Sequence, residues 1–248
     1  MGSLTVPRRG GLPAIPKRSA ALERIRQAKP PAMFQASSAD LRRAALDAGR
    51  PRILLAVDAT ASREAAWGAA KATTDALFTA IPGALDVGLA VHGGSRVHTW
   101  TEFSQDAACL RDKAAGVRCD AGRTRLVEVL ERARAVERLK VVCYIGDVFE
   151  EGLHDAVEAA TALKLKGCRV IILHDTGDVM AGMSDGAFHA IADASGGCVL
   201  PFDAGSPARL RELLEALAVL AAGGLRLLQE RRKALPGARL LLEHLGED

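Results

Sequence analysis

Three short stretches of the sequence carry oxygen-bearing side chains that together could hold a metal ion. The first stretch ends an apolar run with Asp58, Thr60 and Ser62, which alternate with alanines. The second contains Thr124, and the third places Asp147 after another apolar run. Carboxylate and hydroxyl oxygens are hard ligands, so this set suits Mg²⁺ or Mn²⁺ better than Zn²⁺.

Two predicted strands would bring the acids to one edge of a sheet. Residues 53–57 and 141–146 are short apolar runs without alternation, a pattern typical of strands that are buried on both faces. Each run leads into an acid, Asp58 or Asp147. Ligands of open α/β sheets bind beyond the carboxyl ends of the strands, so we expect both acids at the functional edge.

The combination resembles the metal-ion-dependent adhesion site (MIDAS) of von Willebrand factor A (VWA) domains. That site has the pattern Asp-x-Ser-x-Ser, followed by a Thr and an Asp from later loops. The matching residues here are Asp58, Thr60, Ser62, Thr124 and Asp147. Thr60 replaces the family's usual first serine, which keeps the hydroxyl and adds a methyl group. The resemblance covers roughly residues 51–222.

This resemblance also implies how the site would work. The five side chains and waters would hold the ion and leave one position open, which a carboxylate from a partner protein fills. Three short segments, at residues 58–64, 146–151 and 201–207, are similar to sequences of a bacterial intracellular subfamily of VWA proteins.

Other interpretations of Asp58 stay open. On its own, the segment from Asp58 to Ser62 is also typical of a helix cap or a turn. A metal-dependent phosphohydrolase with Asp58 as its nucleophile would use a similar sheet. Such an enzyme needs a second acid as proton donor, and the corresponding residue is Thr60, whose hydroxyl cannot do acid–base work near neutral pH.

Composition limits the class of protein. The 248 residues are 49% hydrophobic and 4% aromatic, enough for one large α/β domain with an aliphatic core. Residues 1–52 hold 11 Lys and Arg against 3 acids, within a net charge of +3. A nucleic-acid-associated protein that uses this basic arm is therefore a further alternative. The arm lacks an aromatic platform for bases, which disfavours that alternative.

The subcellular location of the protein is predicted from features that the sequence lacks. The five cysteines are an odd number without Cys-x-x-Cys spacing, which indicates neither a disulfide framework nor a zinc site. No run of about 18 apolar residues predicts a membrane span. The N-terminus has no apolar signal core. We expect a cytoplasmic protein, which disfavours extracellular adhesion.

The chain divides into three predicted regions. Residues 1–37 form a basic, Pro- and Gly-rich arm that we expect to be largely disordered. Residues 38–222 form the VWA-like domain with a preceding helix, and residues 223–248 form a helical extension. The predicted fold is α/β, a doubly wound and mostly parallel sheet with helices on both faces. A short turn makes residues 96–100 an antiparallel edge strand.

Periodicity predicts the positions of the other elements. Further strands are expected at residues 85–92, 168–174 and 197–201. Helices are expected at residues 64–79, 107–115, 126–135, 153–166, 182–194 and 207–222. Two leucine-rich helices, at 225–235 and 238–245, should fold back onto the domain, with partner binding as the alternative.

Several polar residues near the predicted site have more than one interpretation. Gly122 permits a close turn that brings Thr124 to the ion. His92, at a strand end, could face the metal site, but polar surface is the preferred expectation. Glu150 and Glu151 would supply favourable charge at the start of the helix at 153–166, or else form a negative rim.

We therefore predict an interaction module rather than an enzyme. The sequence has no recognisable Ser/His/Asp or Cys/His arrangement and no phosphate loop. The predicted function is metal-dependent binding of an acidic residue on a partner protein, in a cytoplasmic adaptor or assembly factor.

Overall fold

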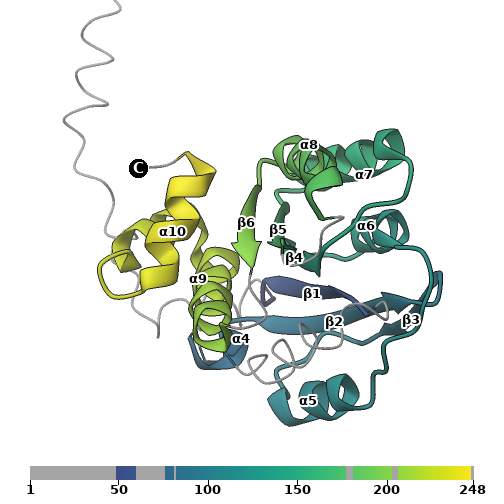
Figure 1. The fold of residues 1–248 in the computed structure, drawn as a ribbon. Coiled ribbons are helices and arrows are strands. Elements are labelled where there is room, and N and C mark those ends of the chain that lie inside the picture. Colours follow the sequence, from purple (N-terminus) through teal and green to yellow (C-terminus); the bar gives the residue numbers. More distant parts are fainter. Residues whose placement is uncertain (1–48, 60–75, 81, 177–180, 203–205, 247–248) are drawn as a thin grey trace, which may run out of the picture. The chain divides into compact units, whose positions relative to one another are not determined.

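The computed structural model describes most of the predicted domain and its extension. The described residues are 49–59, 76–80, 82–176, 181–202 and 206–246 (Figure 1). The predicted arm, the helix expected before the first strand, and most of the helix expected at 64–79 lie outside them. The last turn of that helix is described as α4 (Ala76–Thr79).

Within the described residues, six strands form one sheet in the order β3-β2-β1-β4-β5-β6. Their bounds are β1 (Arg52–Asp58), β2 (Asp86–Gly93), β3 (Arg96–Trp100), β4 (Leu139–Gly146), β5 (Arg169–Asp175) and β6 (Cys198–Phe202). Neighbouring strands are parallel except β2 and β3, which form an antiparallel pair at the edge. The predicted fold class is confirmed.

Alternate residues of β1 enter two different cores, because successive strand residues point to opposite faces. Ile53 and Leu55 pack with α4, α9, α10 and α5 (Ala107–Ala115). Leu54 and Ala56 pack with α6 (Leu126–Arg134), α7 (Leu153–Leu165) and α8 (Asp185–Ser195), which follows the short helix η3 (Ala181–Met183). Helices thus cover both faces (Figure 1), which explains the unbroken apolar strands.

The C-terminal helices differ in detail from the prediction. α9 (Pro207–Arg231) joins the helix expected at 207–222 to most of the one expected at 225–235, and it is broken at Gly224, whose φ of 68° and ψ of −169° are not helical and suit a residue without a Cβ. α10 (Pro236–Leu245) then begins at the proline rather than two residues later. The helical conformation is thus interrupted at the Gly-Gly pair, where the first of the two helices was predicted to end.

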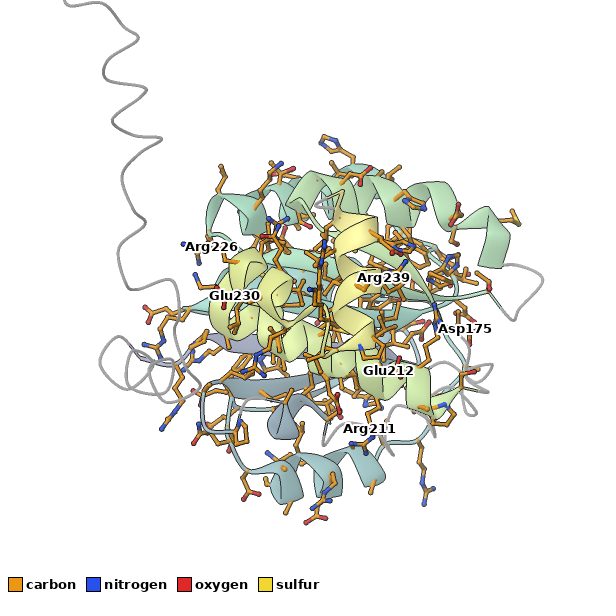
Figure 2. All side chains as sticks on the ribbon, turned by 90° about the vertical axis from the view of Figure 1, so that its left-hand side faces the viewer. Asp175, Arg211, Glu212, Arg226, Glu230 and Arg239 are labelled. Carbon is orange, nitrogen blue, oxygen red and sulfur yellow. The ribbon has the colours of Figure 1, made fainter. Side chains whose placement is uncertain are left out.

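Both C-terminal helices pack onto the domain, as predicted. Leu227, Leu228, Leu241 and Leu242 are buried in the same core as the odd-numbered residues of β1. Charged side chains, including those labelled Arg226, Glu230 and Arg239, are exposed on the outer side of these helices (Figure 2). No helix of the described residues is long and apolar enough to cross a membrane.

Candidate metal centre

Two buried acids lie at the carboxyl ends of neighbouring strands, at the edge where the strand pattern predicts them. Asp58 is the last residue of β1, and Asp147 immediately follows β4. Their exposed fractions are 1% and 3%. Because Val57 pairs with Ile145 in parallel register, the two segments leave the sheet on adjacent strands.

The loop that carries Thr124 is held against the same edge. The Asp120 amide donates a hydrogen bond to Ala59 O (2.9 Å), and the Gly94 amide donates to Asp120 O (3.2 Å). These bonds join the loop to the segments that follow β1 and β2. Thr124 itself is buried, with 2% of its surface exposed. Three chain segments therefore bring Asp58, Thr124 and Asp147 to one edge.

Gly122 is needed for this close approach. A Cβ at that position would meet Ser95 N and would lie 2.6 Å from Gly94 Cα, both backbone atoms of the β2–β3 turn. We predict that Gly122→Ala lowers the free energy of unfolding by about 1–3 kcal/mol, because the turn and the loop must separate. Urea denaturation measures this change. Gly186→Ala is the control: nothing lies within 4 Å of its new Cβ. A Gly122→Ala variant as stable as that control would contradict the prediction.

His92 is buried, and the prediction that it forms polar surface is wrong. Its Nδ1 accepts a hydrogen bond from the Arg125 amide (3.3 Å) and lies 3.8 Å from Asp58 Oδ1. The ring stacks on Tyr144 at a centroid distance of 5.8 Å. Burial, and to a smaller extent the charge of His98, lowers the pKa of His92 to about 3. The ring is therefore neutral at pH 7 and gives Asp58 no counter-charge.

The two acids at residues 150 and 151 contact the Thr124 loop and the start of α6. Glu150 N donates to Thr124 Oγ1 (3.2 Å), and Thr124 N donates to Glu150 Oε2 (3.4 Å). Glu151 Oε1 accepts from Leu126 N (2.6 Å), and Glu151 Oε2 accepts from Val127 N (3.2 Å). The preferred interpretation, charge at the start of the helix 153–166, did not include the contact of Glu151 with the start of α6. Burial raises the pKa of Glu151, and these amide hydrogen bonds oppose the rise.

His174 is a buried residue of the same edge that the sequence analysis did not include. It lies near the end of β5 and donates from Nε2 to the backbone oxygen of Asp147 (3.1 Å). Its ring also packs edge-on against Phe188 of α8, with centroids 4.8 Å apart. The signal was present in the sequence, since another unbroken apolar strand ends at His174-Asp175.

The complete ligand set stays a prediction. Thr60 and Ser62 lie outside the described residues. Among the residues that are described, no group of three or more His, Cys, Asp and Glu side chains could hold a metal. The predicted set contains only two carboxylates and depends on hydroxyls for the remaining oxygens. The described part of the site supplies Asp58, Thr124 and Asp147 at one edge, all with oxygen donors.

Comparison with protein-family models and with curated proteins gives no match to this sequence. Among solved structures, proximal thread matrix protein 1 from the mussel byssus is similar in two crystal forms. The TM-scores are 0.53 and 0.54 at 16% and 18% identity, over 68% of this chain. The fold is VWA-like. The match spans 46% of the mussel chain, less than half its length, and at this identity it shows the fold alone.

Two further similar structures score lower. The SpRpn10 VWA domain matches with a TM-score of 0.48 at 13% identity, over 65% of this chain and 95% of that domain. Manganese-loaded Plasmodium vivax TRAP protein matches with a TM-score of 0.37 at 14% identity, over 50% of this chain and 57% of that one. At such scores neither likeness carries an argument about this chain's metal or partner.

Proposed function

We propose that this chain is a metal-dependent protein-interaction module. In this proposal, Mg²⁺ or Mn²⁺ is held by the predicted MIDAS-type set Asp58, Thr60, Ser62, Thr124 and Asp147. An acidic residue of a partner protein completes the site. A cytoplasmic adaptor or assembly factor of the bacterial intracellular VWA subfamily is the role that fits this chemistry. A VWA-like fold supports the proposal, because such domains are commonly interaction modules and usually not catalytic.

The observation that carries the proposal is the gathering of Asp58, Thr124 and Asp147 at the carboxyl edge. They come from three separate segments, and each is almost fully buried. Two carboxylates and a hydroxyl at one edge of the sheet are the kind of oxygen donors that Mg²⁺ and Mn²⁺ prefer in proteins. Their position beyond the carboxyl ends of the strands is also where open α/β sheets bind ligands, which supports a cation site there.

The side chains of the edge would divide the work. Asp58 and Asp147 supply negative charge, and the hydroxyl of Thr124 supplies a neutral oxygen. A bound divalent ion with mostly neutral direct ligands stays electrophilic and attracts an external carboxylate. His92 would be an uncharged neighbour of the ion and not one of its ligands, because its Nδ1 already accepts a hydrogen bond from the Arg125 amide.

Partner capture tests this function. We predict that the immobilised protein retains a partner from a native lysate in Mg²⁺, and loses it in a chelator, because the two acids then repel the partner's carboxylate. Thr124→Ala should weaken capture without unfolding the domain, since it removes only a hydroxyl and a methyl group. Captured proteins are compared by quantitative mass spectrometry. A partner that binds equally well in chelator and to the Thr124→Ala variant would show that recognition lies elsewhere.

A further inference from the structure

The start of α6 is capped by a residue that is distant in sequence. Arg125 occupies the N-cap position and makes no side-chain capping hydrogen bond. The first amides of a helix have no intrahelical acceptors and need partners elsewhere. Leu126 N and Val127 N find theirs in the Glu151 carboxylate, which belongs to the loop between β4 and α7. Glu151 thus does for α6 what an N-cap side chain normally does, but from another loop.

This cap joins two loops that carry predicted metal ligands. Thr124 lies just before α6, and Asp147 opens the loop to which Glu151 belongs. The reciprocal bonds between Thr124 and Glu150 form a second link between the same loops. Of the two acids, Glu150 is exposed and its carboxylate contact is long at 3.4 Å, whereas Glu151 is half-buried and makes a contact of 2.6 Å. Glu151 is therefore the stronger side-chain link.

We infer that Glu151 is a positioning residue for the metal centre: by capping α6, it fixes the Thr124 hydroxyl relative to Asp147. This inference rests on the proposed metal-binding function. Groups that orient metal ligands without touching the metal commonly change metal affinity about 10- to 100-fold when they are removed. Glu151 would act in this way through the backbone of α6 and through its side-chain hydrogen bond with Thr124, not through a direct contact with the ion.

Glu151→Ala in the full chain tests the inference with two readouts. In metal-free protein, hydrogen exchange of the Leu126 and Val127 amides should become faster, because their acceptor is lost. In a Mn²⁺ titration followed by electron paramagnetic resonance of the free ion, affinity should fall about 10-fold or more. Glu151→Gln keeps one acceptor oxygen and should lie between wild type and the alanine variant. If the alanine variant folds poorly, the same two measurements are made on Glu151→Gln instead.

A matched control separates positioning from loss of stability. Asp106 caps α5 by accepting from Ala108 N (2.9 Å) and Cys109 N (3.0 Å), and it takes no part in joining the two loops. Asp106→Ala therefore removes a helix cap of the same chemical kind, and it should keep Mn²⁺ affinity within about 2-fold of wild type.

The outcomes distinguish the inference from the function on which it rests. Wild-type Mn²⁺ affinity in Glu151→Ala, or unchanged exchange of its two amides, would overturn the positioning role while leaving the metal site standing. An equal loss of affinity in Asp106→Ala would also overturn it, since any lost cap would then suffice. Absence of Mn²⁺ binding in the wild-type protein would instead refute the proposed function and the positioning role with it.

Discussion

Asp58→Ala is expected to abolish measurable Mn²⁺ binding. The wild-type protein should bind one Mn²⁺ with a Kd of roughly micromolar to millimolar strength, as expected for a mixed carboxylate and hydroxyl site. Removing Asp58 deletes one of the two carboxylates of the predicted set, so affinity should fall by more than about 100-fold, beyond the usual effect of an indirect group. Isothermal titration calorimetry measures both proteins.

Thermal denaturation is a second test of metal binding by the Asp58→Ala variant. Saturating metal stabilises a protein that binds it only when folded, by about 2.7 kcal/mol at a hundred times the Kd. Mg²⁺ or Mn²⁺ should therefore raise the Tm of the wild type and leave that of Asp58→Ala unchanged. Asp193→Ala, at an exposed position of α8, is the control and should respond as the wild type does. Unaltered metal binding by Asp58→Ala would refute the ligand assignment.

Leu241→Ala is expected to lower the free energy of unfolding by about 2–5 kcal/mol. Leu241 of α10 is fully buried, in the same core that contains Leu228 of α9 and Ile53 of β1. Truncation would leave a cavity between the C-terminal helices and the sheet. This loss is large compared with the free energy of unfolding of a typical domain, which is only about 5–15 kcal/mol. Urea denaturation followed by circular dichroism measures it.

Leu165→Ala is the matched control, because Leu165 is a helical leucine with 86% of its surface exposed. That variant should change stability by less than about 0.5 kcal/mol. If both variants behave alike, α10 does not pack on the domain in solution, and its leucines are free to bind a partner. A selective loss in Leu241→Ala would instead make the C-terminal helices a structural part of the domain.

Much of the fold could be predicted because its signals are local. Residues 53–57 and 141–146 are apolar without alternation, a pattern typical of strands buried on both faces. The Gly93-Gly94 turn fixed the antiparallel edge strand. The Gly223-Gly224 pair likewise marked the break within α9, because Gly224 leaves the helical conformation there. The packing of the leucines that follow could not be predicted in this way, since it depends on contacts with segments distant in the sequence.

The site was partly predictable for the same reason. Asp58 and Asp147 are marked by the strands that they end, and parallel strands bring their ends to one edge. The contact of Glu151 with α6 and the burial of His92 depend on loops that meet only in the folded chain. Glu151 precedes α7 in the sequence but binds amides of α6, the helix that comes earlier in the chain. The sequence pattern around Glu151 does not show which of these two helices its carboxylate contacts.

The pairing of β1 with β4 also has a consequence for the order of folding. Val57 and Ile145 are far apart along the chain, with β2, β3, α5 and α6 between them. Parallel pairing over such a separation forms slowly, because the intervening chain must be closed into a loop first. Both carboxylates of the edge are brought together only by that pairing, so the unfolded chain offers a divalent ion no preformed site. An ion bound at this edge would therefore stabilise the folded chain without binding the unfolded one.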